Sequence, residues 1–332
     1  MKASVIVPVR NGERTIEKCL KAILAQNLGQ SFELIVVDDG STDKTAEIVK
    51  KFKKARLFRQ EPLGPAAARN AGAIKAKGEI IVFTDADCIP EKNWLSEMLK
   101  PFEDPMVAGV QGAYKTQQKE FMARFSQIEI EERYKKMLSS KTIDWIGSYS
   151  AAYKRSVFLS LNGFDKAFKK ASGEDPDLSY SIQEKDHKIV FNPKAIVFHH
   201  HPVSLAEYLK KKFQHACWRV LLYKKHSSKA VSDSYTPQFL KAQIGFLGIF
   251  SICLLLSLWN ETMLFFALAA LVLLIFCMLP FVFFALKRDF FIGIASPAIL
   301  LLRDIAFIGG LLKGILFLVW NNSASEKVNK IK

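Results

Sequence analysis

The sequence predicts an α/β fold, with a mostly parallel sheet flanked by helices, followed by an amphipathic helix and an α-helical transmembrane region. Three observations lead to this prediction. Apolar strands and helices alternate over residues 1–90, and polar residues follow the strands at their carboxyl ends. Long apolar stretches then occupy most of residues 239–320.

The first 90 residues are expected to form βαβ units. Short apolar segments there are separated by stretches with apolar residues at helical spacing. Strands are predicted at 4–9, 32–37, 56–58 and 79–83, with helices at 14–26 and 65–76 and a further helix capped by Ser41. Strands joined by short helices indicate a parallel sheet, which binds ligands outside the carboxyl ends of its strands.

Residues 105–202 are less regular and complete a predicted soluble domain that spans residues 1–202. Strands are expected at 106–113, 189–191 and 196–198, and a charged surface helix at 120–138. The chain opens directly into a strand, which predicts that no signal peptide precedes the domain and that the domain is cytoplasmic.

A basic amphipathic helix is predicted at 203–226, within an interface region at 203–234. Its apolar residues share one face: Leu205, Leu209, Phe213, Ala216, Cys217 and Val220. Lysines and an arginine supply the remaining surface. This pattern is typical of a helix that lies among lipid headgroups, and a helix that packs against another part of the chain would show it too.

The region at 235–320 is predicted to cross a membrane. Residues 239–259 and 262–286 each exceed the length of about 20 residues that spans a hydrocarbon core. The turn between them is very short, so they are expected to form a hairpin. The stretch at 290–320 is interrupted by charges and is either a third span or an interfacial helix with a short one after it. The basic tail at 321–332 favours a cytoplasmic end and an even number of crossings, so two, three and four crossings stay open.

The chain is basic, with a net charge of +15. Residues 239–332 hold 8 Lys and Arg and 4 Asp and Glu, which leaves +11 for the rest of the chain. The basic residues cluster beside the apolar segments, which favours anionic lipid over nucleic acid as the partner. Five cysteines lack CxxC or paired spacing, which argues against a disulfide framework and a zinc site: Cys19, Cys88, Cys217, Cys253 and Cys277.

Polar residues gather after three of the predicted parallel strands, at 8–11, 38–41 and 84–87. One ligand could therefore touch all three junctions. Asp85 and Asp87 follow a buried strand one residue apart, and such a pair can hold a divalent cation against a diphosphate. No Gly-x-Gly-x-x-Gly motif and no P-loop lysine is present, so a dinucleotide oxidoreductase and a P-loop enzyme are not expected.

Four blocks in order resemble the signature blocks of family 2 glycosyltransferases with the GT-A fold: VIVPVRN at 5–11, VVDDGSTD at 36–43, GPAAARNAG at 64–72 and TDAD at 84–87. The resemblance continues through GFD at 163–165 and GEDPDL at 173–178, and covers roughly residues 1–220. It implies a nucleotide-sugar half at 1–115 and an acceptor half at 116–202. The apolar C-terminal region resembles that of membrane-anchored members.

The resemblance implies a role for each block. Pro8, Val9 and Asn11 would line the nucleotide pocket, and Asp39 would accept a hydrogen bond from a uracil or guanine base. Arg69 would face the diphosphate.

The two aspartates of the fourth block would divide their work. Asp85 would touch ribose or sugar and contribute to the metal site, and Asp87 would be the most direct ligand of Mn²⁺ or Mg²⁺. His200, in a run of three histidines, is a further candidate ligand.

The block at 173–178 implies the catalytic base. Asp175 is expected to take the acceptor's proton in an inverting transfer, with Glu174 orienting it. The same residues would also make a good start for a helix, and both roles can hold together.

A last block resembles the Gln-x-x-Arg-Trp motif of processive members, with Gln214 and Trp218 in place and Cys217 where Arg is expected. Arg219 follows one position later. These residues are candidate contacts for the acceptor or the donor, and the departure argues against a processive polysaccharide synthase.

The resemblance therefore implies a membrane-bound, metal-dependent inverting glycosyltransferase, with its catalytic domain cytoplasmic. It would move a hexosyl-type sugar from a UDP- or GDP-sugar to a lipid-linked acceptor. One alternative is a polyprenyl-phosphate monosaccharide synthase, and another, of a different class, is a non-catalytic membrane scaffold that retains the fold.

Overall fold

The computed structural model describes residues 2–168, 173–231, 233–234 and 236–329. The chain forms two compact units, one of residues 1–118 and 134–201 and the other of residues 119–133 and 202–332. Residues 119–133, which lie within the predicted domain of residues 1–202, belong to the second of these units. Residues 330–332 of the predicted basic tail lie outside the described residues.

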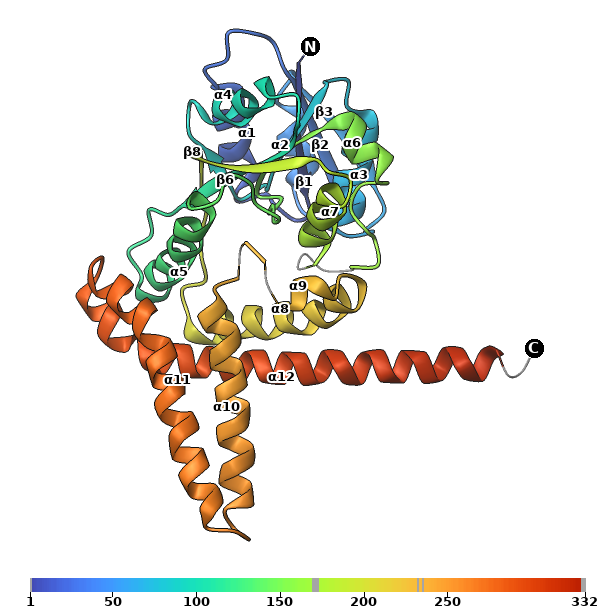
Figure 1. Cartoon of the computed structure of the whole chain (residues 1–332). Coiled ribbons are helices and arrows are strands. Elements are labelled where there is room, and N and C mark those ends of the chain that lie inside the picture. The colour runs from blue at the N-terminus through green and yellow to red at the C-terminus, as the bar shows by residue number, and fades with distance from the viewer. Residues whose placement is uncertain (1, 169–172, 232, 235, 330–332) are drawn as a thin grey trace. The chain divides into compact units, whose positions relative to one another are not determined.

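The first unit is built on a mixed, mostly parallel sheet (Figure 1). Its described strands are β1 (Ala3–Val9), β2 (Glu33–Asp39), β3 (Ala55–Gln60), β4 (Ile80–Thr84), β5 (Ile89–Pro90), β6 (Val107–Lys115), β7 (Ser150–Lys154) and β8 (Lys188–Phe198). Their order in the sheet is β3-β2-β1-β4-β7-β6-β8-β5. The first four strands of that order are parallel, and β7 runs antiparallel to β4 and β6. The predicted α/β fold is confirmed.

Helices cover both faces of this sheet: α1 (Ile16–Leu24), α2 (Thr45–Lys50), α3 (Pro65–Lys75), α4 (Trp94–Leu99), α6 (Arg155–Ser160) and α7 (Glu174–Gln183). Alternate side chains of a strand point to opposite faces, so Val5 and Val7 join one core with α1 and α4. Ile6 points the other way, toward α3. A Cβ at Gly72 would collide with Ile6 and press on Val37, which explains how α3 lies so close to the strands.

The later strands of the first unit, between residues 89 and 198, differ from their prediction. The strands expected at 189–191 and 196–198 are two halves of β8, which runs as one strand through residues 192–195. β6 was expected at 106–113 and is found at Val107–Lys115. β5 and β7, which are short, were not predicted.

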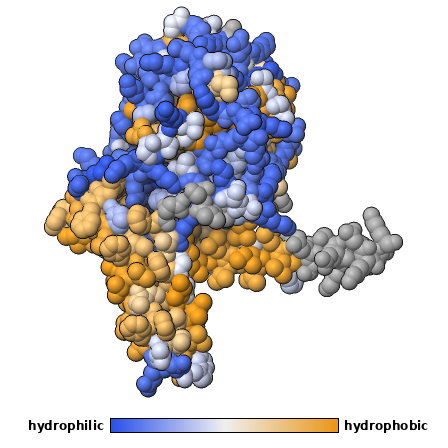
Figure 2. Space-filling model, in the orientation of Figure 1, coloured by the Kyte–Doolittle hydropathy of each residue, from blue (hydrophilic) through white to orange (hydrophobic). Residues whose placement is uncertain are grey.

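The second unit is helical: α8 (Leu205–Lys225), α9 (Ser228–Val231), α10 (Gln238–Leu256), α11 (Thr262–Leu286), α12 (Phe290–Asn329) and the first part of α5 (Phe121–Leu138). Three of these helices contain stretches long and apolar enough to cross a membrane, namely Phe239–Leu256, Thr262–Leu286 and Phe290–Trp320. Their exposed side chains form a large apolar surface (Figure 2). Within this unit, α10 and α11 run side by side and α12 runs across them (Figure 1).

Two helices of the second unit are more buried than their sequence pattern indicates. Phe125 of α5 is fully buried and packs edge-on against Tyr208 of α8, so the predicted surface helix contributes to a core. The apolar face of α8 packs against α12, where a Cβ at Gly310 would collide with the carbonyl of Phe213. The packing alternative for the amphipathic helix therefore accounts for much of its apolar face.

Candidate active site

The parallel strands place three polar junctions at one edge of the sheet. Val9 pairs with Asp38, and Ile6 pairs with Phe83, so β1, β2 and β4 end near one another in register. Asp39 ends β2, and Asp85 and Asp87 follow β4. The carboxyl edge of such a sheet is where ligands bind in α/β folds.

Asp39 is buried and holds the loop that leads into α3. Its Oδ1 accepts hydrogen bonds from Gln60 Nε2 at 2.7 Å and from the Leu63 N–H at 2.9 Å, and its Oδ2 accepts from the Gly64 N–H at 2.9 Å. Gly64 has a φ of 95°, which favours glycine and lets the chain turn into the helix. A carboxylate offers about four acceptor positions. Three are used, so Asp39 keeps room for one more hydrogen bond.

Asn11 ties the loops after β1 and β2 together. Its backbone N–H donates to Ser41 Oγ at 2.9 Å, and its Oδ1 accepts from the Thr42 N–H at 2.9 Å. Asn11 has a φ of 52°, a conformation that asparagine tolerates better than most residues. Pro8 and Val9 lie in β1 with both side chains buried, so the chain offers a ligand only backbone groups there. Contact of these residues with a nucleotide stays a prediction.

Arg69 links two ends of the site. Its guanidinium is almost fully buried and donates from Nη2 to Asp85 Oδ1 at 2.7 Å, with Nη1 3.4 Å from Glu174 Oε1. Its Nε has no hydrogen-bond partner among the described residues. Arg69 therefore joins the loop after β4 to the first turn of α7, and the predicted contact with a diphosphate would have to share this cation with two carboxylates.

Asp175 keeps one carboxylate oxygen without a partner. Its Oδ2 accepts from the Ser148 N–H at 2.9 Å and the Ser148 hydroxyl at 3.1 Å, while its buried Oδ1 has no hydrogen-bond partner among the described residues. Burial, followed by the neighbouring Glu174, raises the pKa of Asp175 to about 7, although Arg69 opposes the shift. A carboxyl group with a pKa near neutrality and a free oxygen is suited to take a proton.

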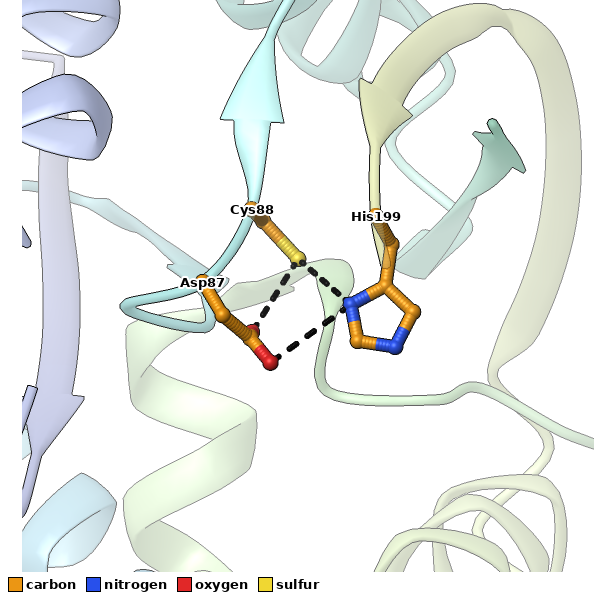
Figure 3. A group of neighbouring side chains, drawn as sticks. All are labelled: Asp87, Cys88 and His199. Carbon is orange, nitrogen blue, oxygen red and sulfur yellow. Dashed lines mark hydrogen bonds and ion pairs between the residues drawn. The ribbon is translucent and has the colours of Figure 1, made fainter. Parts of the chain in front are cut away.

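Asp87, Cys88 and His199 form a cluster (Figure 3). Asp87 Oδ2 lies 3.6 Å from His199 Nδ1, and Cys88 Sγ lies 3.8 Å from Asp87 Oδ1 and 3.9 Å from His199 Nδ1. The pairing of β5 with β8 brings these distant residues together, because Ile89 lies opposite Phe198. The residues just outside this pair, Cys88 and His199, are then neighbours.

The imidazole at this cluster is His199, whereas the sequence had pointed to His200. Successive side chains of an extended chain point to opposite sides, so only one of the two can face Asp87. His200 is exposed and lies outside the cluster. The His199 ring stacks on Tyr114 at a centroid distance of 4.7 Å, which fixes its orientation.

The cluster fits a divalent cation. Asp87 is 47% exposed and offers carboxylate oxygens beside an imidazole nitrogen, and both are common ligands of such ions. Asp85, predicted as a second ligand, is bonded to Arg69 and is not part of the cluster. Its place next to Asp87 still leaves it at the rim of the site.

Gln214, Trp218 and Arg219 lie on α8 in the second unit. Arg219 Nη1 donates to Tyr223 at 3.1 Å and to Thr236 at 3.1 Å within that unit. Contact of these three residues with donor or acceptor stays a prediction.

Three site residues were not predicted. His199 differs from the predicted histidine by one position, and a two-residue strand was too short a signal to set that register. Cys88 directly follows the Asp-x-Asp step, and its position was the available signal. Ser148 carries no motif of its own, because its role depends on where α7 begins relative to the loop before β7.

Comparisons with known proteins agree with this architecture. Residues 4–160 match the family model described as glycosyl transferase family 2. The pre-mycofactocin glycosyltransferase of Mycobacterium tuberculosis is 27% identical over 220 residues, which are 63% of this chain and 45% of that protein. The probable glycosyltransferase YdaM of Bacillus subtilis is 29% identical over 218 residues, 60% of this chain and 51% of that protein. The chain thus spans about half the length of these two relatives.

A solved structure shares the fold. The mannosyltransferase PcManGT from Pyrobaculum calidifontis, determined with GDP-Man and Mn²⁺, matches with a TM-score of 0.62 over 95% of this chain and 87% of that one, at 23% identity. The first unit has the GT-A fold, and apolar helices follow it. Residues 4–160, slightly less than half of the chain, are thus similar to glycosyl transferase family 2, and three helices after them are long and apolar enough to cross a membrane.

Proposed function

We propose that this protein is a membrane-bound, metal-dependent inverting glycosyltransferase that moves a sugar from a UDP- or GDP-sugar to a lipid-linked acceptor at the cytoplasmic leaflet. The observation that carries the proposal is the pairing of a proton acceptor with a cation-binding cluster through one buried arginine. Arg69 bonds to Asp85, two residues before Asp87, and reaches Glu174, next to Asp175. A transferase that inverts needs both a base for the acceptor and charge stabilisation for the departing diphosphate.

Asp175 is the base in this proposal. Ser148 holds Oδ2 by two hydrogen bonds, so the carboxylate cannot rotate freely and Oδ1 is left to receive the acceptor's proton. Glu174 is buried, accepts from the Gly173 N–H at 3.1 Å and lies against Arg69. It positions the start of α7 and, by its charge, keeps the pKa of its neighbour high.

Asp87 and His199 are the proposed cation ligands. A bound Mn²⁺ or Mg²⁺ would neutralise charge on the leaving nucleoside diphosphate. Arg69 adds a fixed positive charge at the same edge, held in place by Asp85. The donor complex of the Pyrobaculum mannosyltransferase, with GDP-Man and Mn²⁺, supports this class of donor and metal.

The second unit supports a lipid-linked acceptor. α10 and α11 are joined by a short turn and would cross the membrane as a hairpin. We infer that α12 lies along α8 at the membrane surface, so that the chain crosses twice with both ends cytoplasmic.

Charges buried in the second unit support this topology. Arg303 in α12 donates from Nη2 to Gln243 Oε1 at 2.5 Å and lies 3.3 Å from Glu129 Oε1. Glu129 also binds Lys212 Nζ at 2.5 Å. Burial acts to raise the pKa of Glu129, but the positive charges of Lys212 and two nearby arginines lower it by more. The net effect is a lowered pKa, so the carboxylate stays charged. Such a charged network is costly at the centre of a bilayer and much less so at its surface.

Asp175 also bears on the choice of acceptor. A hydroxyl acceptor must lose a proton, whereas a phosphate acceptor is already ionised at neutral pH. The free oxygen and raised pKa of Asp175 favour a hydroxyl on a lipid-linked glycan over the polyprenyl-phosphate alternative.

The test is a screen of the full chain in detergent with UDP- and GDP-sugars and either Mn²⁺ or Mg²⁺, scored by donor hydrolysis and by transfer to lipid-linked acceptors. We expect metal-dependent turnover of one donor class. The absence of binding and turnover with every donor would favour the non-catalytic scaffold.

A further inference from the structure

We propose that Cys88 is a third protein ligand of the cation site, so that the centre binds a thiophilic, tetrahedral cation such as Zn²⁺ or Co²⁺ more tightly than Mg²⁺ or Mn²⁺. The inference rests on the proposed function only for the place of the cation beside the donor. Its physical basis is the cluster of Asp87, Cys88 and His199, which brings an oxygen, a sulfur and a nitrogen donor to one point (Figure 3).

The separations between the donor atoms are closer to the edges of a tetrahedral site than to those of an octahedral one. Zinc bonds of about 2.1 Å to oxygen and nitrogen and about 2.3 Å to sulfur give tetrahedral edges of about 3.4 to 3.6 Å. Octahedral Mg²⁺, with bonds of about 2.1 Å, needs edges of about 3.0 Å between adjacent ligands. The separations observed here are 3.6 Å from Asp87 Oδ2 to His199 Nδ1, 3.8 Å from Asp87 Oδ1 to Cys88 Sγ and 3.9 Å from Cys88 Sγ to His199 Nδ1, so the two distances from Asp87 start at its two different oxygens. They exceed the tetrahedral edges by only a few tenths of an ångström.

The donor types favour the same cations. Imidazole suits zinc and cobalt, and a thiol selects softer metals than carboxylate and water do. Mg²⁺ requires oxygen ligands and keeps several waters. The exposed carboxylate of Asp87 could bind it in this way, but the buried sulfur of Cys88 would add nothing to its affinity. By the general order of affinities for divalent metals, Mn²⁺ also binds more weakly than Co²⁺ or Zn²⁺ at such a site.

The surrounding structure holds the three donors in place. Cys88 is fully buried, and its backbone N–H donates to the Asp85 carbonyl at 3.0 Å. The His199 N–H donates to the Lys115 carbonyl at 2.9 Å, and the ring stacks on Tyr114. Asp87 is the exposed member. Three protein ligands with one side open resemble the plan of catalytic zinc sites, in which the fourth position takes water or substrate.

The metal that binds this site most tightly would then differ from Mg²⁺ or Mn²⁺, the ions usually tested for activation. Zn²⁺ should displace Mn²⁺ from the site at much lower concentration, and turnover should respond to that exchange. A second buried thiol provides a matched control. Cys19 Sγ lies 3.5 Å from the Asp85 carbonyl and is outside the cluster.

The experiment is a Co²⁺ titration of the metal-free full chain in detergent, followed by absorption. We expect a thiolate-to-cobalt charge-transfer band in the near ultraviolet in the wild type and in Cys19→Ser. Cys88→Ser should lose the band, and its affinity for Zn²⁺, measured by competition with Co²⁺ or a chelator, should fall by about 10- to 100-fold or more. Far-ultraviolet circular dichroism checks that both variants are folded.

Bound Co²⁺ without the band in the wild type, or a band that persists in Cys88→Ser, would overturn the inference. If Cys88→Ser does not fold, His199→Gln keeps the thiol and still tests the site, because unchanged Zn²⁺ affinity in that variant contradicts the shared site. The outcomes separate the two proposals. Donor turnover without the band leaves the proposed function intact, whereas the band without turnover of any donor leaves only the metal site.

Discussion

The carboxylates at the sheet edge fall into two groups that the sequence makes look alike. Asp38 and Asp39 end β2, are buried, and spend their oxygens on hydrogen bonds within the protein. Asp87 is about half exposed, and Asp175 keeps one oxygen without a partner. The first group builds the loops of the site, whereas in the second Asp87 faces His199 and Cys88, and Asp175 has an oxygen that can receive a proton. An acidic residue at a ligand edge is therefore a candidate for chemistry only after its existing bonds are counted.

The largest expected effect comes from Asp87→Ala. If Asp87 is a cation ligand, turnover of the donor should fall by about a thousandfold or more, because a bound cation contributes several kcal/mol to stabilising the leaving group. In the absence of metal, the free energy of unfolding should change by about 0.5 kcal/mol or less, since the side chain is about half exposed. Steady-state kinetics and thermal unfolding measure the two quantities. Full activity in the variant would remove Asp87 from the metal site.

A similar or smaller loss is expected for Asp175→Asn. Removal of a general base should lower kcat by about 10²- to 10⁴-fold, while donor binding, measured by calorimetry, stays near its wild-type value. Asn keeps the size of the side chain and an acceptor for Ser148, so folding should be preserved. Unchanged transfer would exclude Asp175 as the base, and would favour an acceptor that is already ionised.

The pH dependence sharpens the same assignment. A base acts in its deprotonated form, and burial together with Glu174 raises the pKa of Asp175 to about 7. The rate of transfer should therefore rise as the pH increases through about 7 and level off above it. The rise should be absent from the residual activity of Asp175→Asn. A profile that is flat in the wild type between pH 5.5 and 8.5, on the order of 1.5 pH units to either side of the expected pKa, would contradict the prediction.

The largest effect on folding is expected for Asp39→Ala, whereas its effect on turnover should come only through donor binding, since Asp39 is neither the proposed base nor a proposed cation ligand. The substitution removes the acceptor for two backbone N–H groups and one amide, and should lower the free energy of unfolding by about 1 to 3 kcal/mol. Chemical unfolding of the full chain in detergent measures this, with Asp87→Ala as the matched control. Equal stability of the two variants would break the distinction between the two groups of carboxylates.

Much of the first unit could be predicted from sequence, because its signals are local. The strand β1 is a short apolar run and the helix α3 is an Ala-rich segment, so each is defined within one short stretch, and the residues after β2 and β4 follow from the ends of those strands. The same argument placed Glu174 and Asp175 at the start of a helix, where α7 begins.

The parts that could not be predicted depend on long-range pairing. Cys88 and His199 are 111 residues apart and meet only because β5 pairs with β8 in one register. A shift of one residue would have turned His200 toward Asp87 instead. The bonds of Arg69 likewise join the loop after β4 to α7, and no local pattern shows that this cation is shared between two carboxylates.

The short strand β5 has one more consequence. It contributes only two residues, Ile89 and Pro90, to the edge of the sheet. Backbone pairing alone therefore holds β5 against β8 by few hydrogen bonds. A cation held by Asp87 and His199 would cross-link the loop after β4 to the residues that follow β8. Its binding free energy would then count toward folding, by about 2.7 kcal/mol when the metal is present at 100 times its Kd. The concentration of free metal would therefore affect the free energy of unfolding as well as the rate of the reaction.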